Sequence, residues 1–400
     1  MKRFLNQNMP ESKNNTGADS IWNDPDKRAV IFQVAALFVV LGVGYYLFAT
    51  TRANLARQSI ATGFAFLEKE SAFEIGESVI RYSAADHYGR ALIVGVLNTL
   101  KVSFIGIILT VFIGTVVGVA RLSTNWLMSK LASIYIEVFQ DIPVLLQLFF
   151  WYAIFYENLP SPRQAAQPFN GAFLSNRGLV VAVPESHAAH FHMFMAFLAG
   201  CLAIYALCYW AKKRQEQTGK AFPVIRASAG ILIIFPLIAW AVAGAPTAMN
   251  VPRLSGFNFE GGYNISPEFG ALLLGLVLYT AAFVAEIVRA GIQSVSRGQS
   301  EAAMSLGLKP PSVLNLVILP QALRVIIPPL TSQLLNLTKN SSLAVAIGYP
   351  DFVSVANTTI NQTGQAIEGV MLIMAVYLFL SLTTSLIMNW YNKKMALVER

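Results

Sequence analysis

The amino-acid sequence predicts an all-α polytopic membrane protein with about 8 transmembrane helices. The chain is 55% hydrophobic and only 12% charged, whereas soluble domains carry roughly 25% charged residues. A helix needs about 20 apolar residues to cross the ~30 Å hydrocarbon core of a bilayer. The runs that meet this requirement are Ala29–Ala49, Leu100–Ala120, Ile134–Tyr156, Phe191–Ala211, Ala227–Gly244, Phe269–Val288, Val325–Ile347 and Gly369–Trp390.

Lys and Arg residues decide the predicted orientation, because cytoplasmic loops of membrane proteins carry an excess of them. When the N-terminus is placed inside, most of the 29 Lys and Arg residues fall in cytoplasmic loops. The densest cluster is KKRQEQTGK, at Lys212–Lys220. Both termini are therefore predicted to face the cytoplasm. The net charge of +8 is scattered over short loops, which indicates membrane topology rather than a nucleic-acid partner.

The first apolar run is predicted to remain in the protein as an anchor. The polar stretch before it, residues 1–28, is too long and too acidic for the n-region of a signal peptide. The run itself is also too long for the h-region of such a peptide.

The outer loops carry three features of note. The loop after the first run contains the amphipathic stretch IATGFAFLEKESAFEIGESVIRYSA, which is expected either to lie on the membrane surface or to pack on other helices. The next outer loop, residues 157–190, is rich in Pro, Asn and Gly and is expected to be irregular. Its HAAHFH sequence offers too few ligands for a metal site. We therefore expect interfacial packing there, and no metal.

The inner loop between the sixth and seventh runs, residues 291–323, interrupts the apolar sequence with EAAMSLGLKPPSVLNLVILP. Ser296 and Gln299 fit the S-x-x-Q capping box that opens a helix. The short helix is predicted to end where Gly307 adopts the left-handed conformation, and the two prolines that begin at Pro310 forbid its continuation.

One face of this short helix is expected to hold Ala302, Ala303 and Leu306, with Glu301 beside them. Because alanine side chains are small, they permit close approach of a second protein. The alternative is a loop helix that packs on its own bundle, and the residues alone leave both possibilities open.

The pattern Glu301-Ala302-Ala303, then Gly307, then Val317-Ile318-Leu319-Pro320 resembles the signature loop of ABC importer membrane subunits, with Val317 in place of the usual Ile. The segments AAFVAEIVRAGIQSVSRGQ and LLNLTKNSSLAVAIG are similar to the polar amino-acid (histidine permease-like) branch of that family. Within the branch, the chain most resembles the larger permease subunit of a general L-amino-acid transporter. The resemblance covers most of residues 95–392.

This resemblance implies a type I ABC importer transmembrane fold, with a five-helix core and three extra helices. The implied domains are a cytoplasmic N-terminal tail (1–28), an extra transmembrane helix with a periplasmic segment (29–90), a permease transmembrane domain (91–392) with an inserted helix pair (191–244) and a cytoplasmic coupling loop (291–323), and a cytoplasmic C-terminal tail (393–400). The residues implied to couple to an ATPase are Glu301, Ala302, Ala303, Leu306, Gly307 and Pro310.

The resemblance also implies partners in a bacterial inner membrane. These are a second permease subunit, homologous but not identical, two cytoplasmic ATPase subunits and a periplasmic amino-acid-binding protein. The chain has no G-x-x-x-x-G-K-[ST] phosphate-binding loop. It is therefore not expected to be an enzyme by itself, and ATP and Mg are expected on the ATPase subunits.

Ionisable residues inside the apolar runs mark the expected translocation pathway, because such groups face a bundle interior or a cavity. Lys339 lies in LLNLTKNSSLA, and the prolines before it suggest a broken helix. Glu286 is a candidate partner for Lys339, although it can equally pair with Arg289 on its own helix. Lys101 lies near the outer end of its run and is expected to snorkel. The predicted pathway residues are Lys339, Asn336, Thr338, Asn340, Ser341, Ser342 and Glu286.

Two other functions remain open at this stage. One is a secondary transporter that works alone, with Lys339, Glu286 and Asp141 as an ion relay. The other is a channel in which polar residues only line a pore. Either of these proteins would function without an ATPase, whereas a permease subunit would be inert without one.

Overall fold

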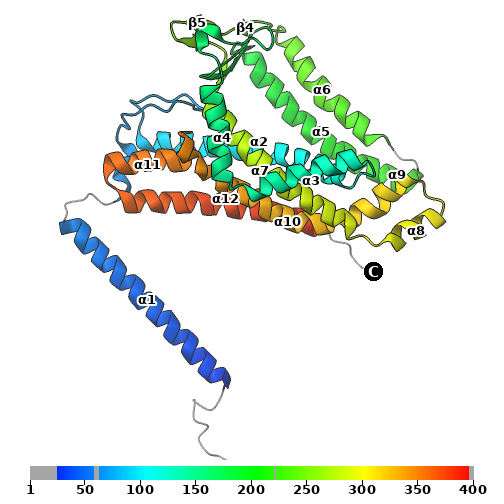
Figure 1. The fold of residues 1–400 in the computed structure, drawn as a ribbon, viewed down its shortest axis with the longest axis horizontal. Coiled ribbons are helices and arrows are strands. Elements are labelled where there is room, and N and C mark those ends of the chain that lie inside the picture. The colour runs from blue at the N-terminus through cyan, green and yellow to red at the C-terminus, as the bar shows by residue number, and fades with distance from the viewer. Residues whose placement is uncertain (1–24, 58–62, 220–221, 396–400) are drawn as a thin grey trace, which may run out of the picture.

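The computed structural model describes residues 25–57, 63–219 and 222–395 (Figure 1). The predicted N- and C-terminal tails lie outside these residues, apart from 25–28 and 393–395. The α-helices are α1 (Pro25–Arg57), α2 (Tyr88–Arg121), α3 (Trp126–Asp141), α4 (Val144–Glu157), α5 (Ala188–Thr218), α6 (Val224–Val242), α7 (Pro267–Gln293), α8 (Arg297–Ser305), α9 (Pro310–Val313), α10 (Leu319–Asn340), α11 (Phe352–Thr363) and α12 (Ala366–Met395).

Shorter elements join these helices. Turns of 3-10 helix are η1 (Phe64–Glu68), η2 (Pro162–Gln164) and η4 (Ser341–Ile347), and η3 (Leu314–Ile318) is a π-helix. The strands are β1 (Ala172–Ser175), β2 (Gly178–Val181), β3 (Val183–Pro184), β4 (Met249–Asn250), β5 (Arg253–Ser255), β6 (Asn258–Glu260) and β7 (Tyr263–Ile265).

Seven of the described helical segments are long and apolar enough to cross a membrane, and one bent pair raises the number to eight. The predicted class, an all-α polytopic membrane protein with about 8 spans, is confirmed.

The predicted third span is wrong in one respect, because it is broken. Helices α3 and α4 meet at 104°, whereas the run Ile134–Tyr156 was expected to be one helix. Pro143 has no N–H to donate to a helix, and it keeps the residue before it out of the helical region. Ile142 is accordingly extended, with φ −89° and ψ 125°.

The centre of the bundle is the contact of α2 with α7, on which α4 and α10 also pack. Gly118 permits this contact, since a Cβ there would lie 2.6 Å from the carbonyl oxygen of Ala285. Small residues allow helices in membranes to approach closely and to gain dispersion contacts. Thirteen residues of α2 and fourteen of α7 are buried, so this pair holds the remaining helices in place.

The first outer segment packs on the bundle and is not a surface helix. Phe66 in η1 is 2% exposed, and Phe73 and Tyr82 lie against a core cluster formed by α2 and α11. Further along the segment, Glu77 forms an ion pair with Lys101 of α2. Lys101 therefore does not snorkel as expected, because its side chain is only 15% exposed.

The outer loops around the inserted helix pair are folded into strands, so the expectation of an irregular loop at 157–190 is wrong. Strands β1, β2 and β7 form one antiparallel sheet, and β3–β4 and β5–β6 form two further pairs. His187 and His190 form the N-terminal cap of α5. Among the described residues, no cluster of His, Cys, Asp or Glu could hold a metal ion.

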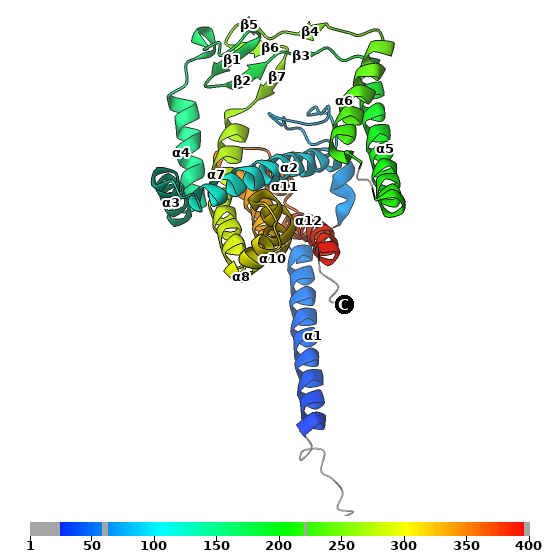
Figure 2. The same ribbon diagram turned by 90° about the vertical axis from the view of Figure 1, so that its right-hand side faces the viewer.

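The extra helices stand at the margin of the molecule. Helix α1 projects away from the bundle in both views (Figures 1 and 2), and the apolar part of this helix has no buried residue. Helices α5 and α6 form an antiparallel pair that packs chiefly on itself. The bundle of α2, α3, α4, α7, α10, α11 and α12 therefore forms the core without them.

Candidate functional site

Helix α8 lies at the end of the bundle opposite α11 (Figure 1). It runs from Arg297 to Ser305, and Gly307 then turns the chain with a φ of 83°, as predicted. Leu306 is 84% exposed, and Glu301 and Ala302 are also exposed, as are Gly307 and Pro310. Because burial of one leucine side chain contributes about 1.5–3 kcal/mol, this open face is suited to a second protein.

Two details of the prediction for α8 are wrong. Ser296 is the N-cap residue, but its side chain makes no capping hydrogen bond, so Ser296 and Gln299 do not form a capping box. Ala303 is only 5% exposed because α8 packs on the π-helix η3. Ala302 and Leu306, four residues apart on one face, form the open surface without it.

A nearly continuous rod connects this surface to the membrane. Helix α9 passes directly into η3 and then into α10. Pro320 cannot donate to the carbonyl oxygen of Leu316, four residues earlier, which accounts for the wider π-helical turn at this point. The Gln321 side chain donates to the carbonyl oxygen of Val317 at 3.0 Å. The helical segment from Pro310 to Asn340 is therefore continuous, with no loop between α9 and α10.

Glu286 joins α7 to the C-terminal end of α2. Arg289 donates from Nε to both carboxylate oxygens of Glu286 at 3.1 Å, which confirms the pairing within α7. Arg121, at the end of α2, also pairs with Glu286. The alternative pairing of Glu286 with Lys339 is therefore wrong. The contact with Arg121 escaped the sequence analysis because 165 residues separate the two positions.

The predicted pathway residues from Asn336 to Ser342 lie at the end of α10, whereas Glu286 lies on α7, whose last turns pack against the start of α10, so it does not join them. Helix α10 runs unbroken through Pro328 and Pro329 and ends at Asn340, so the expected break occurs later in the chain. The hydroxyl of Ser341 donates to the carbonyl oxygen of Thr338 at 2.7 Å, and that of Ser342 donates to the carbonyl oxygen of Lys339 at 2.8 Å. These hydroxyl groups therefore cap the helix end.

A polar stripe remains open on α10. Ser332, Asn336 and Lys339 are exposed and lie four and three residues apart, on one face of the helix. Thr338 is buried. Lys339 makes no ion pair with any residue in the described part of the chain.

Comparison with known proteins decides the family. Residues 106–397 match the family described as "Binding-protein-dependent transport system inner membrane component". The "Putative amino-acid ABC transporter permease protein YhdX" of Escherichia coli (strain K12) is 50% identical over 378 residues, which cover 94% of this chain and 96% of that protein. The chain belongs to this inner membrane component family.

Two further relatives are similar over nearly their whole length. The "General L-amino acid transport system permease protein AapQ" of Rhizobium johnstonii is 48% identical, over 94% of each chain. The "Glutamate/glutamine/aspartate/asparagine transport system permease protein BztB" of Rhodobacter capsulatus is 39% identical, over 93% of this chain and 95% of that one. The predicted resemblance is confirmed.

The residues that match the family, 106–397, include all of α8, η3 and α10. The match begins within α2, so α1 and the first outer segment lie outside it. The two predicted sites, the open face of α8 and the polar end of α10, therefore lie at opposite ends of the continuous helical segment α9–η3–α10.

Proposed function

We propose that this chain is the membrane-spanning permease subunit of an ATP-driven, binding-protein-dependent amino-acid importer. The proposal is supported by the family, by relatives whose names refer to amino-acid transport, and by one structural observation. That observation is the open face of α8, where Leu306 is 84% exposed at the inner end of the bundle. An exposed leucine on a short polar helix outside the apolar spans is suited to burial against a second protein.

The proposed mechanism is that of a lever. A cytoplasmic ATPase holds α8 in a cleft, and closure of two ATPase subunits on ATP and Mg moves the helix. The rod of α9, η3 and α10 carries the motion to the polar end of α10. An effector shifts such an equilibrium only through contacts that differ between two states. The ATPase supplies those contacts, and this chain supplies the rod.

A second permease subunit completes the proposed pathway. Exposure of Lys339 to lipid would cost about 2.5–3.5 kcal/mol at membrane depth on insertion scales. The stripe of Ser332, Asn336 and Lys339 therefore faces water or protein in the assembly. We propose that a homologous, non-identical permease chain covers it and that Glu286 holds the inner ends of α2 and α7 beside the pathway.

The remaining partners follow from the same proposal. A periplasmic binding protein delivers the amino acid to the outer face, two ATPase subunits bind ATP and Mg, and lipid surrounds the apolar helices. The chain resides in a bacterial inner membrane with both termini in the cytoplasm, in agreement with the excess of Lys and Arg in the inner loops.

The proposal is tested by the variant Leu306→Asp in the full chain, expressed with its partner subunits. A buried, unpaired carboxylate opposes docking, so we expect co-purified ATPase to fall by about tenfold or more. The matched control is Leu254→Asp, at an exposed position on the outer strand β5, which should retain the ATPase. Retention of the ATPase by Leu306→Asp would contradict the proposal.

The same preparations distinguish the proposed ATP-driven importer from an ion-coupled secondary amino-acid transporter. That alternative requires uptake by liposomes that contain only this chain and an ion gradient. The proposed function requires that such liposomes take up no amino acid until the ATPase, the second permease, the binding protein and ATP are added.

A further inference from the structure

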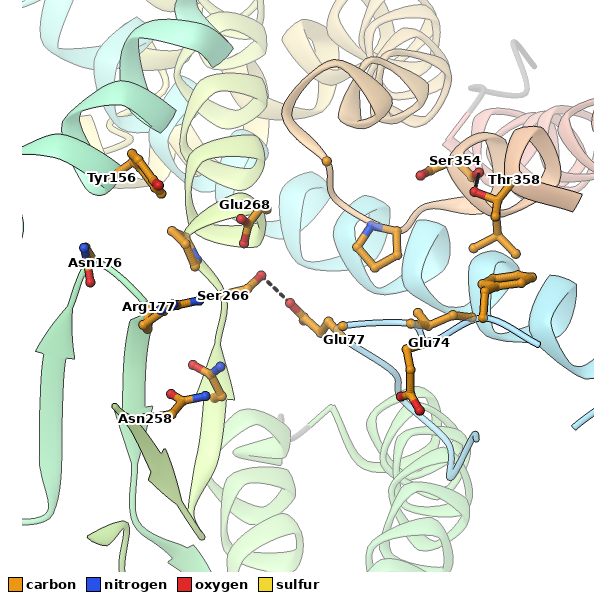
Figure 3. Close-up of a pocket in the computed structure, with 18 residues that line it drawn as sticks. Glu74, Glu77, Tyr156, Asn176, Arg177, Asn258, Ser266, Glu268, Ser354 and Thr358 are labelled. Atoms are coloured by element: carbon orange, nitrogen blue, oxygen red, sulfur yellow. Dashed lines mark hydrogen bonds between the residues drawn. The ribbon is translucent and has the colours of Figure 1, made fainter. Parts of the chain in front are cut away.

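A cavity of about 590 Å³ lies on the outer side of the chain. It is lined by the segment before α2, the end of α4, the β1–β2 turn with strands β6 and β7, the start of α7, and the chain from Gly348 into α11 (Figure 3). This volume falls within the range of about 300–1,000 Å³ that is typical of small-molecule sites. The cavity shares no lining residue with the polar end of α10.

The sheet positions a cation at this cavity. Asn176 and Arg177 form the two-residue turn between β1 and β2. Gly178 follows with a φ of 113°, and a Cβ there would lie 2.2 Å from the carbonyl oxygen of Ile265. Only glycine satisfies both conditions, so β2 lies tightly against β7.

The register of these strands then brings Arg177 to the start of α7. Leu179 is paired with Ile265 in the antiparallel ladder. Beyond this last pair, β2 leads back to the turn that holds Arg177, and β7 leads into the start of α7. Arg177 and Glu268 therefore line the same cavity from neighbouring chain segments.

The charges around the cavity are of two kinds. Glu77 is already neutralised, because it pairs with Lys101 and accepts a hydrogen bond from Ser266 (Figure 3). Glu268 accepts only a long hydrogen bond, 3.3 Å from the hydroxyl of Tyr152. Neither Glu268 nor Arg177 forms an ion pair among the residues that the structure describes. Glu74 also lines the cavity and has no ion pair in the described part of the chain. Two carboxylates, those of Glu74 and Glu268, and the guanidinium group of Arg177 therefore border one cavity without ionic partners.

Apolar groups complete the lining. Phe73, Ile75, Tyr156 and Val355 lie around the cavity beside these charges. The combination of one guanidinium group, two unpaired carboxylates and apolar walls suits a small zwitterion with a variable side chain. An anion alone would meet repulsion from Glu268, and a cation alone would meet repulsion from Arg177.

We propose that this outer cavity is a receiving site for a free α-amino acid. Arg177 binds the α-carboxylate, for which a guanidinium fork is suited, and Glu268 binds the α-ammonium group. The side chain of the amino acid lies against the apolar wall, so the site is selective for the α-amino acid group and tolerant of side chains. This inference rests on the proposed function, and it adds a site on the outer side, apart from α8 and α10.

The experiment measures equilibrium binding of three radiolabelled probes, L-leucine, L-glutamate and L-arginine, to the full chain co-purified with its partner subunits. The variants Arg177→Gln and Glu268→Gln each remove one charge of the cavity. The matched controls are Arg253→Gln and Glu260→Gln, which remove one charge each from paired positions on β5 and β6, away from the cavity lining.

We expect saturable binding of at least one probe, and a loss of affinity of about tenfold or more in each cavity variant, since charge-assisted bonds are the strong ones. Competition against leucine refines the assignment of each group. In the unmodified chain, neither 3-methylbutylamine, which lacks the carboxylate, nor 4-methylpentanoate, which lacks the ammonium group, should compete. In Arg177→Gln, which no longer holds a carboxylate, 3-methylbutylamine should compete as well as leucine does. In Glu268→Gln, which no longer holds an ammonium group, 4-methylpentanoate should compete as well as leucine does.

Absence of saturable binding for all three probes would overturn the inference, and so would equal loss in the control variants. Co-purification of the ATPase in the same preparations reports on the proposed function independently. If the ATPase is retained and no probe binds, the receiving site is wrong and the importer assignment stands. If a probe binds and the ATPase is absent, the receiving site stands and the importer assignment is wrong.

Discussion

Lys101 and Glu77 form an ion pair whose side chains are only 15% and 10% exposed. Removal of one partner from a buried pair leaves an uncompensated charge, at a cost of about 3–5 kcal/mol, whereas removal of both is often nearly neutral. We therefore expect Lys101→Met and Glu77→Gln each to lower the free energy of unfolding strongly, and the double variant to recover much of the loss. Thermal unfolding of the purified chain in detergent measures this, and strictly additive losses would contradict the pairing.

Gly118 offers a second test at a single residue. A Cβ there would lie 2.6 Å from the carbonyl oxygen of Ala285 and 2.9 Å from the Cβ of Val288. Overpacking of this kind costs about 1–3 kcal/mol, so Gly118→Val should lower the melting temperature. The control is Gly44→Val on α1, where no atom lies within 4 Å. Equal effects of the two changes would show that the α2–α7 contact is not the centre of the fold.

Asp351, outside the predicted spans, should give the chain a pH-dependent stability. Burial raises the pKa of this carboxyl to about 6, from an ordinary 3.8, and it caps α11 and accepts from Tyr377 at 3.2 Å. Because the folded state binds the proton more tightly, the group stabilises the fold below about pH 4, and the contribution is lost as the pH rises through 6.

The variant Asp351→Asn keeps a capping side chain and cannot ionise. We expect the melting temperature of the unmodified chain, relative to this variant, to be higher at pH 5 than at pH 7.5. A difference that does not change between these two pH values would contradict the raised pKa.

At the scale of the element, the α5–α6 pair is expected to be dispensable for the core fold. The two helices pack chiefly on each other, and β3 and β4 bring the two ends of the insertion together, with Pro184 opposite Met249. Replacement of residues 185–248 by an Asn-Gly turn, which suits a two-residue hairpin, should leave the melting temperature within a few degrees. Loss of folded protein would show that the pair supports the core.

The helices were largely predictable and their interruptions were not. Apolar length located the spans, and Gly307 with the prolines at Pro310 located the end of α8, because these signals are local. The bend at Pro143 was missed since the apolar run continues through it. The pairings of β2 with β7 and of β3 with β4 escaped prediction because they join segments on either side of the insertion. Glu286 and Lys101 were recognised as notable, but their partners Arg121 and Glu77 depend on tertiary contacts.

At the scale of the whole molecule, the proposed function makes this chain one subunit of a larger assembly. The exposed face of α8 and the polar stripe of α10 are both incomplete surfaces, at opposite ends of one helical rod. The outer cavity lies apart from both of them. A chain of this kind is expected to receive an amino acid outside, to present a pathway with its partner, and to be driven from inside.

The most direct measurement is site-specific photo-crosslinking from position 306, with a benzophenone side chain in place of Leu306, in inner membranes that contain the intact assembly. We expect a crosslink from position 306 to the ATPase subunit. A benzophenone in place of Leu254 on strand β5 should give no crosslink to that subunit. A crosslink from position 306 only within this chain, or to a periplasmic protein, would contradict the account.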